Sequence, residues 1–361
     1  MATIKQIAEA SGVSIGTVSN VLNNLPTVRE AARQRVLDAI EELGYQPSLL
    51  GRALRKDKTN MIVMIVPDIT NPFFPGAVRG AEDVAFQNGF RLVLCNSDNS
   101  FEKEATYLRE MQTYRPSGLI IVPSDLSRGT DEARGYLKAG SCVVYVDRIP
   151  SKWKGDSITS DHERGACAAT RHLIELGHKR IATITGPLPG PSAAARLEGF
   201  QRAMKAAGLK VPPEYIQESE FNKMAGREKA SLLLHLKKRP TAIFAANDLI
   251  AFGVLAAARE TRLHCPEDIS LVGYDNLDDS DATVPTLTTV DQFAYQLGAK
   301  AAQTVVDYIR AGGSPTRRMV QAPELRVKES TARPPRTIEP AWNGASLRAG
   351  TTPPPSRSGT R

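Results

Sequence analysis

One face of a short predicted helix near the amino terminus carries residues whose types and spacing suit contacts with DNA bases. The segment TIKQIAEASGVSIGTVSNVL, residues 3–22, predicts two short helices joined at Gly12, which is the pattern of a helix-turn-helix. The inward face of the second helix comprises Val18, Val21 and Leu22, so its outward face comprises Ile15, Gly16, Ser19 and Asn20. Core packing alone explains such a small, uncharged outward face poorly, although an ordinary helical hairpin is the alternative for this segment taken by itself.

Local signals place the ends of these helices and of a third one. Thr3 and Gln6 have the spacing of a capping box, and Ser14 can cap the second helix. A second capping-box pattern at residues 27–30 predicts the start of a third helix, which ends at Gly44. Its apolar positions are Val36, Ile40 and Leu43. The three helices can therefore close a small core.

The composition is that of a globular protein and says little about partners. Of the 361 residues, 41% are hydrophobic and 24% charged, and no apolar run is long enough to span a bilayer. The amino terminus lacks the apolar core of a signal peptide, so we expect a cytoplasmic protein without membrane association. The net charge of +7 suits a polyanionic partner, but five arginines against one glutamate in residues 331–361 supply more than half of it.

The sequence carries no signature of catalysis or of metal binding. Four cysteines are scattered without CxxC spacing, which favours buried free thiols over disulfides or zinc ligands. We find no phosphate loop, no nucleophile elbow and no metal-ligand spacing. We therefore expect no enzyme activity, no catalytic residue, no cofactor and no metal ion.

After Asn60 the pattern changes to short β-rich apolar runs that alternate with amphipathic helical stretches. This alternation predicts an α/β body with parallel sheets and helices on both faces, and its length suffices for two such layers. Ligands of open α/β sheets bind beyond the carboxyl ends of the strands. The loops expected there carry polar or aromatic residues at positions 67–74, 147–148, 247–248 and 274–276. The segment 331–361, rich in Pro, Ser, Gly and Arg, is predicted to be disordered.

Several motifs in a fixed order resemble the lactose/galactose-repressor (LacI/GalR) family of bacterial transcription regulators. Besides the helix-turn-helix, they include RVLDAIEELGYQPS, IVPDITNPFF, HLIELGHKRIATITGP, PTAIFAANDLIAFG, PEDISLVGYDN and PTLTTVDQ. The resemblance implies a helix-turn-helix domain (1–46), a hinge (47–59) and a two-lobed, periplasmic-binding-protein-like body (60–330). It also implies a repressor that binds a palindromic operator in double-stranded DNA as a homodimer. Because residues 331–361 show no heptad pattern, we expect no tetramer.

The resemblance also assigns DNA contacts. Asn20 stands where many members carry arginine, and asparagine pairs best with adenine whereas arginine prefers guanine. Leu54 occupies the position from which paired hinge helices insert a leucine into the minor groove, and Arg55 can neutralise a phosphate. A plain flexible linker is the alternative for this hinge. The expected DNA-binding residues are Thr3, Ser14, Ile15, Gly16, Thr17, Ser19, Asn20, Leu54 and Arg55.

A small-molecule effector is implied between the two lobes. The family's polar effector positions map onto Asp147, Asp161, Arg196, Asn247, Asp275 and Gln292, a set suited to a polyhydroxylated or anionic molecule. Its aromatic positions map onto Phe73, Phe74 and Phe221, for which core packing is the alternative.

Gly190 stands in a proline-rich loop where purine-binding members carry an arginine, so we expect a sugar or sugar acid as the effector. The alternatives are a nucleoside- or purine-responsive regulator and a solute-binding protein without a role in transcription. Arg148 can pair with an acidic ligand or with a surface carboxylate, and the latter is commoner.

Overall fold

The computed structural model describes residues 2–22, 25–45, 58–126, 130–313 and 316–335. The chain divides into two compact units. The first unit comprises residues 1–68, 78–157 and 298–318, and the second comprises residues 69–77, 158–297 and 319–361. Among the described residues, no helix has both the length and the apolar character needed to cross a membrane.

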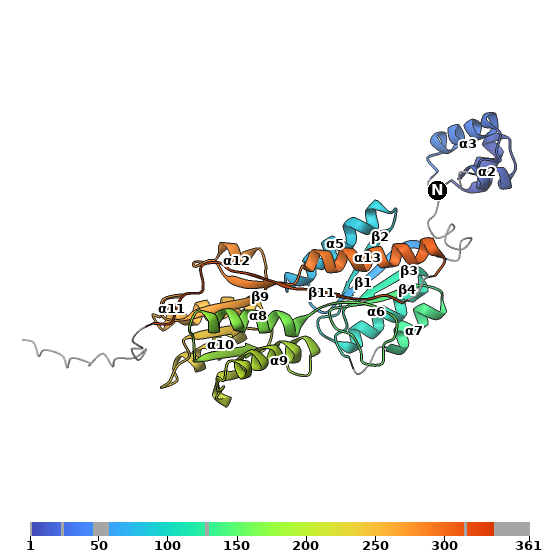
Figure 1. The fold of residues 1–361 in the computed structure, drawn as a ribbon. Coiled ribbons are helices and arrows are strands. Elements are labelled where there is room, and N and C mark those ends of the chain that lie inside the picture. Colours follow the sequence, from blue (N-terminus) through green and yellow to red (C-terminus); the bar gives the residue numbers. More distant parts are fainter. Residues whose placement is uncertain (1, 23–24, 46–57, 127–129, 314–315, 336–361) are drawn as a thin grey trace, which may run out of the picture. The chain divides into compact units, whose positions relative to one another are not determined.

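Three helices form the amino-terminal module (Figure 1). They are α1 (Ile4–Ser11), α2 (Ile15–Leu22) and α3 (Glu30–Glu42). The predicted capping box is confirmed, because the Thr3 side chain accepts from the Gln6 amide while the Gln6 side chain accepts from the Thr3 amide. Gly12 ends α1 with φ of 63°, a conformation that a residue without Cβ adopts at little cost. The core of this module consists of Ile7, Ala8, Val18, Val21, Val36 and Ala39.

The second capping box predicted at residues 27–30 is wrong. Helix α3 begins at Glu30, and its N-cap residue, Arg29, makes no side-chain cap hydrogen bond. The preceding turn is fixed in another way, because the Leu25 carbonyl accepts from the Arg33 guanidinium at 2.7 Å and the Leu25 amide donates to the Asn20 carbonyl at 3.0 Å. Thr27 therefore lies in the turn before the helix.

The first sheet has six strands in the order β11-β5-β4-β3-β1-β2. Strands β1 to β4 run parallel, and helices cover both faces, with α5 and α13 on one side and α6 and α7 on the other (Figure 1). A Cβ at Gly118 of β3 would lie 2.3 Å from a methyl group of Val305, so α13 rests directly on this strand. The strands span Thr59–Val66 (β1), Arg91–Asn96 (β2), Pro116–Ile121 (β3), Cys142–Val146 (β4), Asp156–Ser160 (β5) and Arg318–Gln321 (β11). The helices span Phe73–Gln87 (α5), Phe101–Thr113 (α6), Thr130–Lys138 (α7) and Ala294–Ala311 (α13).

The second sheet also has six strands, in the order β12-β10-β9-β8-β6-β7. Only β12 pairs antiparallel within it; the other pairs are parallel. The strands span Ile181–Thr185 (β6), Ile216–Glu218 (β7), Ala242–Ala245 (β8), Ser270–Asp275 (β9), Thr288–Asp291 (β10) and Glu324–Arg326 (β12). The accompanying helices span His162–Glu175 (α8), Pro191–Ala206 (α9), Lys223–Leu234 (α10), Asp248–Glu260 (α11) and Asp279–Ala282 (α12), with a 3-10 turn at Pro213–Tyr215.

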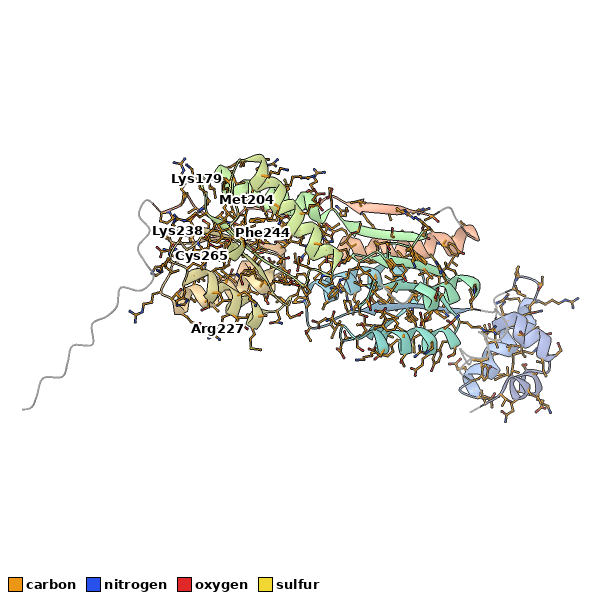
Figure 2. The ribbon with its side chains drawn as sticks, turned by 90° about the horizontal axis from the view of Figure 1, so that it is seen from below. Lys179, Met204, Arg227, Lys238, Phe244 and Cys265 are labelled. Carbon is orange, nitrogen blue, oxygen red and sulfur yellow. The ribbon has the colours of Figure 1, made fainter. Side chains whose placement is uncertain are left out.

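Alternate residues of β8 show how this sheet is buried on both faces. Ala242 and Phe244 belong to the cluster formed with α8 and α9, which includes Met204 (Figure 2). Ile243 and Ala245 belong to the cluster formed with α10 and α11. The predicted α/β body with parallel sheets and helices on both faces is therefore confirmed.

Hydrogen-bonded structure continues past Ser330, where the predicted body ends. The Thr331 hydroxyl lies 3.0 Å from Nε2 of His172, and the Ala332 amide donates to the Ser270 hydroxyl at 3.0 Å. Nε2 of the buried His178 lies 2.9 Å from the Ala332 carbonyl oxygen. The segment expected to be disordered from residue 331 therefore begins with residues bound to the second unit. Residues 336–361 lie outside the described part of the chain.

Helices α10 and α11 approach one another closely because both carry glycine at the contact. A Cβ added at Gly253 of α11 would lie 2.4 Å from the Lys223 carbonyl oxygen and 2.5 Å from the Arg227 amide nitrogen. Both neighbours belong to the backbone of α10, so neither can turn away as a side-chain end would.

We predict that Gly253→Ala lowers the free energy of unfolding by about 1–3 kcal/mol or more, because the added methyl group overpacks this contact. Urea denaturation of the full chain measures the change. Gly135→Ala is the matched control, since the nearest atom to its added Cβ, at 2.9 Å, is the terminal amide of Gln112, which can move. Equal midpoints for the two variants would contradict the contact described here.

Candidate DNA-binding and effector-binding sites

The outward face predicted for α2 is accessible in the structure. Ile15 is 49% exposed, and Gly16 is also exposed. Ser19 and Asn20 are half-buried on the same helix, whereas Val18 and Val21 are buried beneath it. This face is therefore free of the core of its own module.

The start of α2 is fixed by its own side chains. The Ser14 hydroxyl accepts from the Thr17 amide at 3.1 Å, which confirms the predicted cap, and it lies 3.0 Å from the Thr17 hydroxyl. Ser14 and Thr3 are exposed and Thr17 is half-buried. Leu54 and Arg55, the other predicted DNA contacts, lie outside the described residues, as does most of the predicted hinge.

Four of the predicted polar effector residues of the second unit stand at helix starts or strand ends, and a fifth, Arg196, lies within a helix. Asp161 caps α8 and accepts from the Arg164 amide at 3.1 Å, and Asn247 caps α11 and accepts from the Ile250 amide at 2.9 Å. Asp275 is the last residue of β9, and Gln292 follows the last residue of β10. Arg196 lies on α9 and is buried. The carboxyl ends of neighbouring parallel strands thus supply the polar groups, as expected.

Arg196, Asp275 and Gln292 form one hydrogen-bonded and ionic group. Nε2 of Gln292 donates to Oδ1 of Asp275 at 2.5 Å, and Nη2 of Arg196 lies 3.9 Å from the same oxygen. Nη1 of Arg196 donates to the Ala246 carbonyl at 2.6 Å. The guanidinium carbon lies 4.0 Å from the ring centre of Tyr274, within the range of a cation–π contact. All three polar side chains are at most 5% exposed.

Three buried polar atoms of the predicted effector residues in the second unit have no hydrogen-bond partner among the described residues. They are Nε of Arg196, Nδ2 of Asn247 and Oε1 of Gln292. Leaving one buried polar group unsatisfied costs about 1–3 kcal/mol. Two donors and one acceptor are therefore available to a molecule that carries hydroxyl, amide or carbonyl groups.

Phe221 lies against the glycine of the GP motif. A Cβ added at Gly186 would fall 2.1 Å from Cζ of the Phe221 ring, so only glycine leaves room for the ring in this position. The Arg196 guanidinium carbon is 5.9 Å from the centre of the same ring. Phe221 therefore belongs to the same neighbourhood as the polar group, as the sequence indicates.

Phe73 and Phe74 lie at the start of α5 and are only 4% and 3% exposed. Their ring centres are 5.2 Å apart in an edge-to-face arrangement. The two rings thus pack against one another, and a contact with the effector stays a prediction.

Asp147 belongs to the first unit and follows β4 with φ of 62°. Its Oδ2 lies 3.7 Å from Nε of Arg148, whose Nη1 also donates to the Pro123 carbonyl at 3.4 Å. Arg148 thus lies beside the buried carboxylate of its chain neighbour Asp147, which is neither an acidic ligand nor the surface carboxylate that the sequence suggested.

Three further residues contribute to the polar site of the second unit: Tyr274 and Asp248, which the sequence placed in the expected ligand-facing loops without a role, and His162, to which it assigned no part in the site. Tyr274 stacks on Arg196, and Nδ1 of His162 lies 3.4 Å from Nη2 of Arg196. Asp248 is fully buried, accepting from the Thr289 hydroxyl at 2.6 Å and from the Leu277 amide at 2.8 Å. The signal was present, because His162, Asp248 and Tyr274 each adjoin a predicted site residue. Adjacency alone does not say which side chains turn inward.

A helix-turn-helix module, followed by a two-sheet α/β body with buried polar groups at the strand ends, defines a DNA-binding regulator with an effector-binding body. The model for bacterial regulatory proteins of the lacI family matches residues 3–48, and the model for the periplasmic binding protein-like domain matches residues 170–331. The chain belongs to the LacI family of bacterial regulatory proteins.

Relatives of nearly the same length support this assignment. The HTH-type transcriptional repressor PurR of Aliivibrio salmonicida is 34% identical over 332 residues, covering 91% of this chain and 99% of the relative. The protein of the same name from Vibrio vulnificus is 35% identical over 332 residues, covering 91% and 98%. The chain is therefore a DNA-binding transcriptional repressor of this family with an effector-binding body.

Solved structures of the family have the same fold. The lac repressor dimer bound to operator and the anti-inducer ONPF has a TM-score of 0.82 at 27% identity, covering 92% of this chain and 99% of that one. A complex of the transcriptional regulator CelR with cellobiose has a TM-score of 0.69 at 29% identity, covering 91% and 100%. A LacI family regulator from Enterococcus faecium with bound ribose has a TM-score of 0.69 at 32% identity, covering 76% and 99%.

The buried carboxyl of Asp248 makes stability depend on pH. Burial raises the pKa of Asp248 well above its ordinary value, and the nearby charge of Asp275 raises it further. Above the pKa of the unfolded chain, about 3.9, the folded state holds this proton more tightly than the unfolded state. The free energy of unfolding therefore falls as pH rises from there towards the folded pKa.

We predict that Asp248→Asn removes this contribution. The difference in unfolding free energy, variant minus wild type, should rise with pH above about 4 by up to about 1.4 kcal/mol per pH unit. Denaturation of both proteins between pH 4 and 8 measures it, and the subtraction cancels other titrating groups such as Glu104, whose pKa burial also raises. A difference that does not change with pH would show that Asp248 is ionised in the folded state.

Proposed function

We propose that this repressor binds a near-palindromic operator as a homodimer and that a small metabolite at the Arg196–Asp275 group changes its operator affinity. One observation supports the proposed effector site: the buried polar side chains of the second unit include two donors and one acceptor without a hydrogen-bond partner among the described residues. Coupling between effector and operator is a free energy of typically ~1–3 kcal/mol, and it acts equally in both directions.

The exposed face of α2 in the amino-terminal module and the solved structure of a related repressor both support a homodimer. One α2 offers a small exposed face, and a symmetric pair of such helices matches two half-sites of a palindrome. The lac repressor structure, described as a dimer bound to operator, covers 92% of this chain.

The charges around Arg196 favour a neutral effector rich in hydroxyl groups, such as a sugar. Asp275 already balances the guanidinium charge, and Asp161 adds a further carboxylate on the same unit. The group therefore has no excess of positive charge to attract a carboxylate, which makes a sugar acid the poorer choice. Neutral hydroxyl groups can accept from Arg196 and Asn247 and donate to Gln292.

A purine is the second candidate, because the relatives from Aliivibrio salmonicida and Vibrio vulnificus both carry the name PurR. Against it stands the loop before α9, in which Gly190 bonds to the Pro187 carbonyl at 3.0 Å and no arginine is present. The nearest cation on α9 itself is Arg196, already engaged with Asp275 and Ala246.

We predict that a neutral sugar raises the melting temperature of the full chain and shifts its operator affinity. A thermal-shift screen with D-ribose, cellobiose, D-gluconate and hypoxanthine, followed by operator titration with each compound that binds, identifies the effector class and the direction of its effect. Asp275→Asn should weaken binding of that compound by roughly tenfold or more, since a carboxylate hydrogen bond contributes about 1.5–3 kcal/mol. Asp279→Asn, which changes an exposed carboxylate four residues on, is the matched control. A response to hypoxanthine alone would favour the purine candidate over the sugar.

We also predict that Asn20 selects adenine in each half-site. Asparagine can donate to N7 and accept from N6 of adenine, an arrangement that guanine does not offer. Selection of operators from a randomised DNA pool, by the wild type and by Asn20→Ala, measures the preference at each position. The variant should lose about 1–3 kcal/mol of discrimination at a single base pair and keep the rest. A guanine at that position, unchanged in the variant, would disprove the assignment.

A further inference from the structure

The turn that carries Asp275 has an unusual backbone. Asp275 and Asn276 adopt φ values of 114° and 54°, so two successive residues that are not glycine lie in the left-handed region. Such conformations are costly and persist only where the surroundings hold them in place. The contacts of Asn276 and Leu277 show what holds this turn.

Two backbone amides of the turn are bound by buried side chains. The Asn276 amide donates to the Thr289 hydroxyl at 3.3 Å, and the Leu277 amide donates to Oδ2 of Asp248 at 2.8 Å. Thr289 and Asp248 are bonded to one another at 2.6 Å. These contacts fix the path of the chain directly after the carboxylate that faces Arg196.

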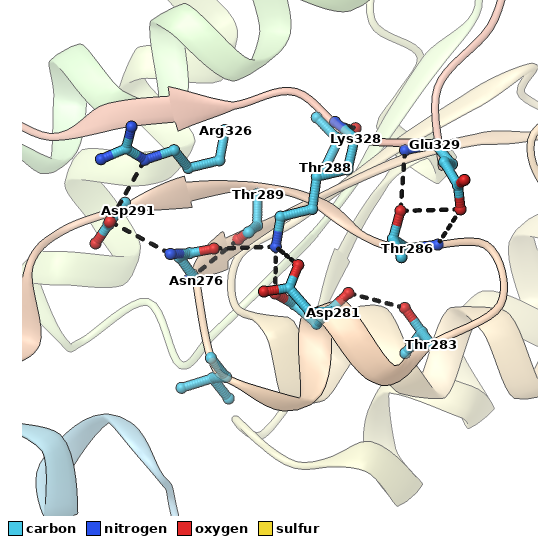
Figure 3. Close-up of polar contacts among 12 residues, drawn as sticks. Asn276, Asp281, Thr283, Thr286, Thr288, Thr289, Asp291, Arg326, Lys328 and Glu329 are labelled. Atoms are coloured by element: carbon cyan, nitrogen blue, oxygen red, sulfur yellow. Dashed lines mark hydrogen bonds and ion pairs between the residues drawn. The ribbon is translucent and has the colours of Figure 1, made fainter.

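Asp291 at the end of β10 and Lys328, just after β12, hold the two ends of the Asn276 side chain (Figure 3). Its Oδ1 accepts from Nζ of Lys328 at 3.2 Å. Its Nδ2 donates to Oδ2 of Asp291 at 3.3 Å, and that carboxylate oxygen lies 3.5 Å from Nε of Arg326. Asn276 is thus bridged to two cations two residues apart.

Lys328 is the centre of this arrangement. Besides Asn276, its ammonium group donates to the Ser280 hydroxyl at 2.8 Å and pairs with Asp281 at 2.6 Å. An ammonium group has three N–H donors, so these three acceptors satisfy it completely. Its side chain is 16% exposed and its own backbone amide donates to the Thr288 hydroxyl at 2.9 Å, so its position is fixed by the sheet.

We propose that Lys328 is a positioning residue for effector binding. It acts through Asn276 to hold the Asp275 carboxylate in the orientation in which it contacts both Arg196 and Gln292. The proposal rests on the proposed role of Asp275 as an effector ligand.

The test compares Lys328→Met with the wild type as full chains. Methionine keeps most of the aliphatic stem and removes all three donors. Hydrogen–deuterium exchange, followed by mass spectrometry of peptides covering residues 274–280, should show at least about tenfold faster exchange at the Asn276 and Leu277 amides. Arg227→Met is the matched control, because this substitution also removes one positive charge and one ion pair, that with Glu260, but at an exposed position of α10 (Figure 2). Unchanged exchange in the Lys328 variant would overturn the proposal without reference to any ligand.

Binding separates a positioning role from a general loss of stability. Whichever of D-ribose, cellobiose or hypoxanthine binds the wild type should bind Lys328→Met at least about tenfold more weakly, while operator affinity without the compound stays the same. Asn276→Ala should reproduce this loss, and the double variant should lose little more than either single variant, since both act through one side chain. Additive losses, or a loss of operator affinity in equal measure, would overturn the proposal. If no compound binds the wild type, the proposed function fails while the exchange measurement still decides this one.

Discussion

The ion pair between Arg196 and Asp275 is the interaction on which the polar site of the second unit depends. Both side chains are almost fully buried, and their closest approach of 3.9 Å is longer than that of a tight bidentate pair. Taking two charges out of water is costly, and an open geometry recovers only part of that cost. The Gln292 amide, the Ala246 carbonyl and the Tyr274 ring give the two charged groups further favourable contacts. A site of this kind is stable yet incompletely satisfied, which suits a receptor for hydroxyl groups.

The surrounding fold explains how such a pair is maintained. Asp275 ends a strand buried on both faces, so its Cα cannot shift without disturbing two cores. Arg196 lies on α9, whose close contact with α8 requires glycine: a Cβ at Gly199 would fall 2.2 Å from the Glu163 carbonyl oxygen. Interiors packed this closely move between discrete arrangements and do not deform gradually. The Arg196–Asp275 pair is therefore surrounded by elements that cannot shift independently of their neighbours.

Much of this structure could be predicted from the sequence, because the relevant signals are local. The capping box at Thr3, the left-handed Gly12 and the alternation of strands and helices depend on neighbours in the chain, and the structure confirms them. The placement of Asn247 and Asp275 at strand or helix ends follows in the same way. The cap predicted at Thr27 failed because α3 begins two residues later, after Arg29, and the Arg33 side chain binds the Leu25 carbonyl of the preceding turn. The role of Lys328 could not be predicted, because its partner Asn276 lies 52 positions away in the sequence and no local pattern indicates such a contact.

Asp161 and Asn247, two residues of the proposed effector site, each also cap a helix, and this restricts how new specificities can arise. One oxygen of each side chain caps a helix, α8 or α11. Only Ser, Thr, Asp and Asn perform that task well. Replacing either residue with another type, to bind a different metabolite, would also remove an N-cap and destabilise the start of a helix that packs on the core. Substitutions that change effector specificity among relatives should therefore occur at positions such as Gln292, whose side chain caps no helix. The two capping positions should vary only among the few residue types that can cap a helix.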